Sequence, residues 1–322
     1  MAIQLKDLLD ARVDELRKDT RGEPMPEPPS MSSGNPERCA VSLYSSAGDL
    51  VTAGDGDEAF TIQSISKAMT YAMALQEHGH EEVHRHVDVE PSGEAYHVIA
   101  VDDVSGKPDN PMVNTGALVV HSLVPGADAD ERFAVTLETM SRMAGRQLAM
   151  DEDVYREEMA STHRNLAIAH LLRAKDILQV DPHEVVDGYT RQCSVLVTVE
   201  DLATMAGTLA AGGVQPTTGE RVFSQEVVRQ VLSVMLTCGM YDDAGDWVSG
   251  VGIPAKSGVA GGILAVAPGR LGIGAWSPRL DDHGTSVRGR ELVRGLAQKL
   301  ELHLLDGRPA TKLDWDARES VD

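Results

Sequence analysis

A serine and a lysine three positions apart have the residue types needed for nucleophilic catalysis, in the run Ser64-Ile65-Ser66-Lys67. Positions three apart share a face of a helix, so the hydroxyl and the amine can meet there. Lysine acts as a base only where burial or nearby positive charge lowers its pKa. The structural alternative is a Ser64 N-cap beside a solvent-exposed Lys67. Apolar Ile62 and Ile65 favour a buried helix start instead.

A second short motif, Lys256-Ser257-Gly258-Val259, comes directly before an apolar run that is typical of a strand. Serine hydrolases with an SxxK nucleophile use a lysine–serine/threonine–glycine motif, and such a strand would wall the site opposite the nucleophile. Glycine lets a substrate approach the backbone closely, and backbone N–H groups can stabilise the oxyanion of a tetrahedral intermediate. Taken alone, this motif is more typical of a flexible turn before a hairpin.

The run from His80 to His84 matches the HExxH pattern of zinc peptidases. Such a site needs a continuous helix, which puts both histidines on one face, and a third ligand. Gly79 comes directly before the run, Pro91 follows soon after, and the neighbouring residues are polar. We therefore expect a solvated helix end and no metal, with a zinc peptidase as the alternative.

Composition argues against several classes of partner. The 322 residues carry a formal net charge of −21, whereas phosphate backbones and anionic membrane surfaces attract positive charge. We therefore expect no nucleic-acid and no membrane partner. The cysteines at 39, 193 and 238 are few and widely spaced, which favours a reducing compartment. With no secretory signal and no run of ~20 apolar residues, we expect a cytoplasmic protein.

The elements that must position these motifs follow from periodicity and turn residues. Strands are predicted near both ends of the chain and helices between them. The predicted elements are a helix at 5–16, strands at 39–45 and 50–53, a helix at 64–76, a helical region at 118–205 whose longest helix is 155–178, strands at 262–266 and 271–276, and a helix at 287–304.

This order predicts an α/β (α+β) fold with a mixed antiparallel sheet built from both termini and an inserted all-helical subdomain. An SxxK motif before the insert and a lysine–serine–glycine motif after it resemble the layout of the beta-lactamase and penicillin-binding superfamily. We predict an N-terminal helix at 1–21, a catalytic domain at 22–306 and a polar tail at 307–322, the sheet subdomain comprising about 22–63 and 250–306 and the helical subdomain about 64–249.

Longer strings resemble the bacterial and mitochondrial-type glutaminase family, a branch of the beta-lactamase-like fold. The similarity runs from about residue 22 to residue 304. The matching strings are FTIQSISK at 60–67, NPMVNTGA at 110–117, TCGMYDDAG at 237–245, GIPAKSGVAGGI at 252–263, SP at 277–278 and SVRG at 286–289. The resemblance implies hydrolysis of glutamine to glutamate and ammonia without a metal or organic cofactor, by a homodimer or homotetramer.

The resemblance also implies roles for residues that carry the chemistry. Ser64 would be the nucleophile, and Lys67 its activating base. Val259 would contribute its backbone N–H to the oxyanion hole. Tyr189 and Tyr241 correspond to the family's two site tyrosines, one of which would relay a proton to the departing ammonia. Each of these tyrosines, taken singly, is also compatible with simple packing.

Three further residues would hold the amino-acid end of the substrate by the same resemblance: Asn114, Glu158 and Asn165. A carboxylate suits an α-ammonium group, and an amide suits an α-carboxylate. Glu158 and Asn165 are seven apart, which is two helical turns, so we expect both on one face of one helix. Taken singly, Asn114 could be a turn residue and Glu158 a solvated helix charge.

The chain departs from the family pattern at two places. Glu27-Pro28-Pro29 stands where the family has Tyr-Ile-Pro, whose tyrosine lines the site, and the run at 96–98 replaces Phe-Asn-Ser. The first change motivates one alternative, a degenerate member that binds an amino acid with little turnover. Another alternative is a beta-lactamase or peptidase of the same fold.

Overall fold

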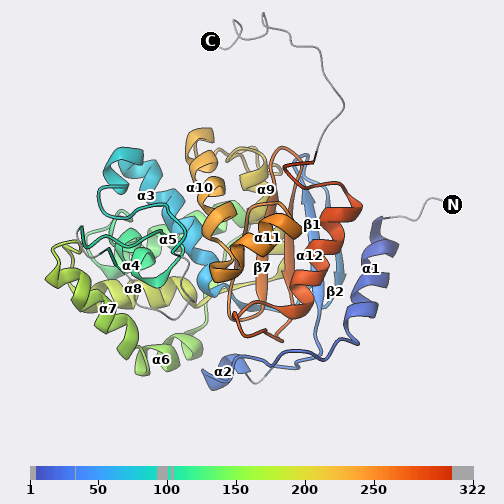
Figure 1. Ribbon diagram of the computed structural model, residues 1–322, viewed down its shortest axis with the longest axis horizontal. Coiled ribbons are helices and arrows are strands. Elements are labelled where there is room, and N and C mark those ends of the chain that lie inside the picture. Colours follow the sequence, from blue (N-terminus) through green and yellow to red (C-terminus); the bar gives the residue numbers. More distant parts are fainter. Residues whose placement is uncertain (1–4, 33, 93–100, 103–104, 307–322) are drawn as a thin grey trace, which may run out of the picture.

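The computed structural model describes residues 5–32, 34–92, 101–102 and 105–306. A sheet stands beside a group of helices in this structure (Figure 1). The predicted tail at 307–322 and the divergent run at 96–98 lie outside the described residues. Among the helices that are described, none combines the length and the apolar character needed to cross a membrane.

The main sheet has five antiparallel strands in the order β2-β1-β8-β7-β6. Their bounds are β1 Ala40–Ser45, β2 Leu50–Gly54, β6 Ala255–Ser257, β7 Gly262–Ala267 and β8 Leu271–Trp276. Strand β1 pairs with β8, with Leu43 opposite Ile273. The sheet is therefore assembled from both ends of the chain, as the sequence predicts.

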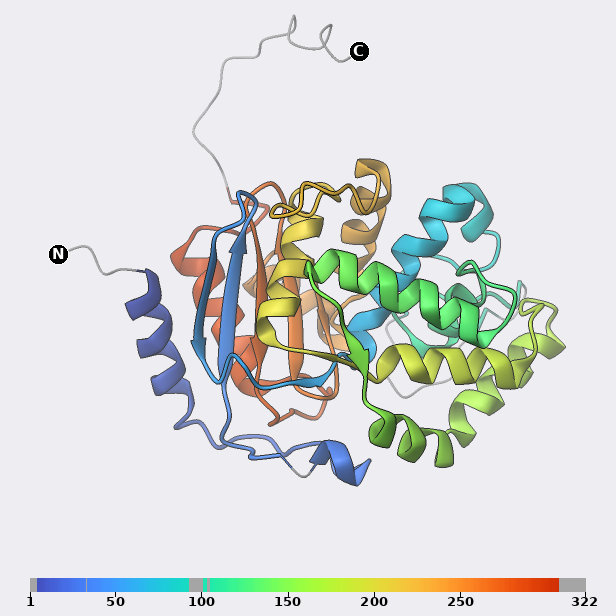
Figure 2. The ribbon, with the colours of Figure 1, turned by 180° about the vertical axis from the view of Figure 1, so that it is seen from behind.

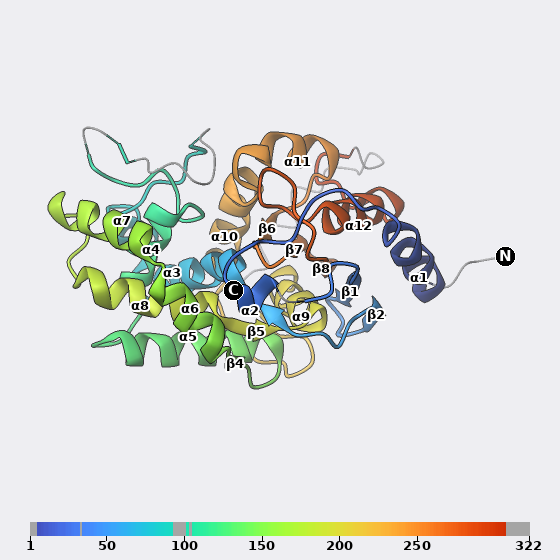
Figure 3. The ribbon, with the colours of Figure 1, turned by 90° about the horizontal axis from the view of Figure 1, so that it is seen from below.

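Helices cover both faces of this sheet (Figures 2 and 3). Helix α9 (Val199–Ala210) packs on one face, and α1 (Leu5–Leu16) and α12 (Val287–Lys299) pack on the other. Glycines let α9 approach the sheet closely, since a Cβ on Gly272 of β8 would lie 2.2 Å from the Gly207 nitrogen of α9. Helix α9 thus belongs with the sheet, although it falls in the range 64–249 that we assign to the helical subdomain.

The remaining helices lie mainly beside the sheet (Figure 1). They are α2 Pro29–Ser32, α3 Ser66–Val83, α4 Asn114–Ser122, α5 Ala129–Ala144, α6 Glu152–Ala160, α7 His163–Ala174, α8 Pro182–Cys193, α10 Gln225–Cys238 and α11 Ala244–Gly250, with 3-10 turns η1 Gln63–Ile65 and η2 Tyr241–Asp243. A small second sheet has the order β3-β5-β4, formed by Phe60–Thr61, Val195–Val197 and Ala149–Met150.

The longest predicted helix, 155–178, is wrong as a single element. It is divided into α6, which ends at Ala160, and α7, which begins at His163. The Ser161 hydroxyl donates to the carbonyls of Glu157 and Glu158, a local bond that competes with helix continuation. The final helix is also shorter than predicted: α12 ends at Lys299, whereas the prediction ended at residue 304.

Candidate active site

Ser64 and Lys67 meet at the junction between a short strand and a long helix. Strand β3 leads into η1, which contains Ser64, and η1 runs directly into α3, which contains Lys67. The Lys67 Nζ donates to the Ser64 Oγ at 2.6 Å. Lys67 is fully buried, and this burial lowers the pKa of its amine from 10.5 to about 8. A neutral amine in contact with a serine hydroxyl can act as its base.

The residue before Ser64 has an unusual backbone conformation. Gln63 has a φ of 50°, which for a non-glycine residue costs roughly 1–2 kcal/mol. Its side-chain Nε2 donates to the Glu158 Oε1 at 2.8 Å and to the Thr61 Oγ1 at 3.1 Å. Backbone strain of this kind persists where surrounding contacts hold it. We missed Gln63 in the sequence, where its position before Ser64 was the available signal.

Strand β6 packs against the turn that contains Ser64. A Cβ on Gly258 would lie 2.9 Å from the Ile62 carbonyl oxygen and 3.3 Å from the Gln63 Cβ, so the close approach requires glycine. Ser257 is fully buried. Val259 is half-buried in the following turn. The Lys256–Gly258 motif therefore lies beside Ser64, and no described residue accepts a hydrogen bond from the Val259 N–H.

Lys256 brings a second buried amine to this site. Its Nζ lies 3.8 Å from the centre of the Tyr241 ring and donates to the Ser257 carbonyl at 2.9 Å. Complete burial, and after it the charge of Lys67, hold the pKa of Lys256 well below its usual value. Tyr241 itself begins η2 with a φ of 58°. The two lysines and Tyr241 thus occupy one low-dielectric region.

Asn114, Asn165 and Tyr189 are joined by hydrogen bonds between three helices. The Asn114 Nδ2 donates to the Asn165 Oδ1 at 3.3 Å, and the Tyr189 hydroxyl donates to the Asn114 Oδ1 at 3.4 Å. The Lys67 Nζ lies 5.7 Å from the centre of the Tyr189 ring. Burial, as the largest cause, raises the pKa of the Tyr189 phenol well above 10, which keeps it protonated.

Our expectation that Glu158 and Asn165 share one helix is wrong. Glu158 is in α6 and Asn165 is in α7, on opposite sides of the break at Ser161–Thr162. Glu158 still reaches the site through Gln63. Burial raises the pKa of the Glu158 carboxyl, and the hydrogen bond from Gln63 opposes that rise. Glu158 acts on the pKa of Tyr189, and Tyr189 is joined to Asn165 through Asn114. Tertiary packing, and not helical periodicity, therefore brings Glu158 and Asn165 into one region.

The segment with the divergent Glu27–Pro29 run also approaches this region. Ser30 in α2 donates its hydroxyl to the Glu157 carboxylate at 2.5 Å. The Met31 sulfur accepts hydrogen bonds from Gln63 Nε2 and Thr61 Oγ1, both at 3.4 Å. A thioether of this segment is therefore in contact with Gln63, the residue before Ser64.

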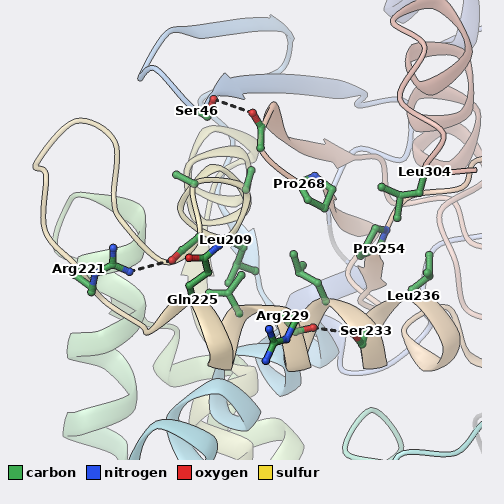
Figure 4. Close-up of a pocket in the computed structure, with 16 residues that line it drawn as sticks. Ser46, Leu209, Arg221, Gln225, Arg229, Ser233, Leu236, Pro254, Pro268 and Leu304 are labelled. Atoms are coloured by element: carbon green, nitrogen blue, oxygen red, sulfur yellow. Dashed lines mark hydrogen bonds between the residues drawn. The ribbon is translucent and has the colours of Figure 1, made fainter. Parts of the chain in front are cut away.

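Two cavities differ in their relation to these residues. The larger, of about 770 Å³, lies between α9, α10 and the β7–β8 turn, and none of the candidate site residues lines it (Figure 4). A smaller one of about 380 Å³ is lined by Asn110, Val113, Cys238 and Tyr241, among others. The smaller cavity therefore adjoins Asn114 and Tyr241.

Comparison with known proteins gives a consistent result. The Glutaminase family model matches residues 22–305. The chain is 43% identical to a glutaminase of Corynebacterium efficiens over 93% of this chain and 71% of that protein. It is 45% identical to a glutaminase of Trichormus variabilis over 86% of this chain and 83% of that protein.

A solved structure, that of the protein Mglu in its glutamate form, is also similar. It superposes with a TM-score of 0.91 at 48% identity, covering 96% of this chain and 72% of that one. The fold is thus the beta-lactamase-like fold of these structures, as expected from the order of the strands and the two motifs. On its sequence and its structure, the chain belongs to the glutaminase family.

Proposed function

We propose that this protein hydrolyses the side-chain amide of L-glutamine to L-glutamate and ammonia through an acyl-enzyme on Ser64. Family membership supports the reaction. The single observation that carries the mechanism is the 2.6 Å contact between the Ser64 hydroxyl and the buried Lys67 amine. The scheme uses no metal and no organic cofactor.

Lys67 acts as the general base for acylation. With a pKa of about 8, roughly a tenth of the amine is neutral at pH 7, compared with well under a thousandth for an exposed lysine. The neutral amine takes the proton of the Ser64 hydroxyl as the oxygen attacks the amide carbon. The new bond joins Ser64 Oγ to that carbon, and the carbonyl electron pair moves to the oxygen.

Two backbone N–H groups, those of Ser64 and Val259, stabilise the resulting oxyanion. Strand β6 and its turn hold Val259 next to Ser64 by packing Gly258 against Ile62 and Gln63. Loss of one donor from such a site costs about 3 kcal/mol in other enzymes. Lys256, Ser257 and Gly258 wall the site but do not take part in bond changes.

The amino-acid end of glutamine is held by Glu158, Asn114 and Asn165. The Glu158 carboxylate pairs with the α-ammonium group, which supplies the positive charge that a partly buried carboxylate favours. The amides of Asn114 and Asn165, already in contact with each other, donate to the α-carboxylate. This arrangement selects a free amino acid over a peptide.

Collapse of the intermediate breaks the bond between carbon and nitrogen, and the proton taken from Ser64 goes to the departing nitrogen as ammonia forms. Tyr189 contacts Asn114 and stays protonated, and with Tyr241 it is the candidate to relay this proton. Water then attacks the acyl-enzyme, with Lys67 again as base, and releases glutamate.

Replacement of Ser64 by alanine tests this scheme. We expect Ser64→Ala to release no ammonia from glutamine at an unchanged melting temperature, while Ser233→Ala, which removes an exposed hydroxyl on α10, keeps full activity. Mass spectrometry of the wild type with glutamine should detect the acyl-enzyme. Full activity of Ser64→Ala would refute the mechanism. Hydrolysis of a chromogenic beta-lactam, or glutamate binding without ammonia release, would favour the alternative functions.

We further propose a cytoplasmic homodimer or homotetramer with a catalytic unit at 22–306. Free, buried cysteines at 39, 193 and 238 fit a reducing compartment, and the glutaminase resemblance motivates the assembly. Sedimentation at several protein concentrations tests the assembly. A monomer at micromolar concentration would contradict it.

A further inference from the structure

A line of buried polar side chains runs beneath the candidate site and has no part in the scheme above. The Nδ1 of His121 lies 2.7 Å from the Gln192 Oε1, the Gln192 Nε2 donates to the Ser66 Oγ at 3.1 Å, and the Ser66 hydroxyl donates to the Gln63 carbonyl at 2.7 Å. The side chains of His121, Gln192 and Ser66 are all fully buried. Buried polar groups are costly unless every partner is satisfied.

This line ends on the strained residue next to the nucleophile. The Gln63 carbonyl that Ser66 holds belongs to the peptide bond that joins Gln63 to Ser64. Gln63 has its φ of 50°, and rotation toward an ordinary value would turn this carbonyl and Ser64 together. The Gln63 carbonyl also accepts the Ser66 backbone N–H, and the Ser66 hydroxyl adds a second bond that stabilises the conformation that aims the Ser64 Oγ at the Lys67 Nζ.

The line also connects the helices that contribute the other site residues. His121 lies in α4, whose first residue is Asn114, and Gln192 lies in α8, one turn after Tyr189. Ser66 is the first residue of α3. One set of hydrogen bonds thus links α4, α8 and the start of α3 to the turn that contains Ser64.

The donors in this line all point one way. Burial lowers the pKa of His121 to about 4, so the ring is neutral at physiological pH and has one N–H. The Gln192 carbonyl oxygen accepts that N–H on Nδ1, which leaves Nε2 as the bare nitrogen. Nε2 has no hydrogen-bond partner in the described part of the chain and lies against Gly188, where a Cβ would be only 2.2 Å away. With the ring neutral, each side chain in the line donates to the next, from His121 through Gln192 and Ser66 to the Gln63 carbonyl.

We propose that Ser66 and Gln192 are positioning residues for the reaction of Ser64: together they hold the Gln63 carbonyl, and through it the Ser64 Oγ, in the geometry needed for acylation. This inference rests on the proposed function of Ser64. Neither residue touches the substrate. Each acts through the Gln63 carbonyl next to Ser64, so its loss slows the chemical step more than it weakens glutamine binding, because Glu158 and Asn165 lie on α6 and α7, which contribute no residue to the line.

The experiment measures kcat and KM for ammonia release, and the rate of acyl-enzyme formation, in Ser66→Ala and in the near-isosteric Gln192→Met. We expect kcat and the acylation rate to fall about 10- to 100-fold, since small misplacements of reacting groups have effects of this size, with KM changed less than about threefold. In the double variant the losses should not multiply, because residues that act as a unit are non-additive. Ser66→Cys, with a weaker donor, should fall between wild type and Ser66→Ala.

Ser194→Ala is the matched control. Ser194 is also fully buried and lies two residues after Gln192, and its hydroxyl donates to the Thr190 carbonyl. We expect it to lose stability like Ser66→Ala while keeping kcat. A folded Ser66→Ala with kcat within twofold of wild type would overturn the proposal. An equal loss of kcat in Ser194→Ala would also overturn it. So would unfolding of both Ser66 variants and of Gln192→Met, because these hydrogen bonds would then serve only the stability of the fold. A wild type that releases no ammonia would instead refute the proposed function.

Discussion

The two ends of helix α3 each contain a motif that matches a short catalytic pattern, but their surroundings differ. At the amino end, Lys67 is fully buried and in contact with Ser64. At the carboxyl end, His80 is exposed, and the His84 Nε2 forms a 2.7 Å hydrogen bond with the Tyr71 hydroxyl. The difference teaches that burial and partners, more than spacing, give a short motif its chemistry.

The carboxyl end of α3 brings the two histidines of the HExxH pattern together, since their ring centres are 3.9 Å apart, but the helix before them is not continuous. Gly79 has a φ of 76° and a ψ of 167°, which interrupts the helix just before His80. Burial, then the neighbouring His80, lowers the pKa of His84 to about 4. Within the ranges that the structure describes, no group of three or more His, Cys, Asp or Glu side chains is placed to hold a metal ion.

Removal of the buried amine should give the largest effect. We expect Lys67→Met, which keeps most of the side-chain volume, to lower kcat by about 10³-fold or more, because general-base catalysis contributes up to about 10⁴-fold. Ammonia release measures this directly. His80→Ala, at the other end of the helix, is the control and should match wild type. If Lys67→Met kept a tenth of the wild-type kcat, the buried amine at the amino end of α3 would not be the general base.

A smaller loss is expected when the charge that holds the substrate is neutralised. Glu158→Gln should lower kcat/KM about 30- to 150-fold, which corresponds to about 2–3 kcal/mol, at the low end for truncated buried charge pairs. Glu157→Gln, one residue away and bonded to Ser30, should stay within about threefold. Equal effects of the two substitutions on steady-state kinetics would contradict a substrate contact by Glu158.

The pH dependence sharpens the role of burial at Lys67. Because the neutral amine is the base, log kcat/KM should rise with pH and level off near the pKa of about 8. Stability should follow the same group: between pH 8 and 10.5 the unfolded chain keeps the proton that the folded chain has lost, so the free energy of unfolding rises with pH there. Lys67→Met should reduce the slope of this rise in chemical denaturation without removing it, because Lys256, whose pKa is also lowered, keeps its own contribution. An unchanged slope in Lys67→Met would contradict the assignment.

The smallest effect on catalysis is expected at the carboxyl end of α3. His80→Ala combined with His84→Ala, or treatment of the wild type with a chelator, should change kcat less than twofold. His84→Ala alone should lower the free energy of unfolding by about 1 kcal/mol, because the Tyr71 hydroxyl loses its partner. Loss of activity with the chelator, and its recovery with zinc, would revive the metallopeptidase alternative.

Local patterns were enough to predict much of the fold. The apolar runs around Ala47–Asp49 and Pro268–Gly269 indicated the β1–β2 and β7–β8 hairpins, and the structure has both. Alternation of apolar residues and turn residues are local properties, so one sequence suffices for them. Helix α1 likewise spans the apolar positions from Leu5 to Leu16 that indicated it, and it ends five residues before the end of the predicted N-terminal segment at 1–21.

The same reasoning failed where the structure depends on a side-chain hydrogen bond or on contacts with distant residues. A seven-residue spacing suggested one helix through Glu158 and Asn165, but Ser161 ends α6 between them. Gln63 went unnoticed because its importance comes from a backbone angle and from contacts with Glu158 and Ser66. The Glu158 partner is 95 residues away and leaves no local pattern, and Ser66 bonds the backbone carbonyl of Gln63, a group that every residue has.

By itself, the sequence determined which groups are available: a hydroxyl and an amine three residues apart, a lysine–serine–glycine strand, and the order of both around a helical insert. Only the tertiary structure decided that Lys67 is buried while His80 is exposed on the same helix, and that four helices bring Asn114, Glu158, Asn165 and Tyr189 together. The reason is physical, since a pKa and a strained turn depend on what surrounds a residue in space, and these neighbours come from distant parts of the chain.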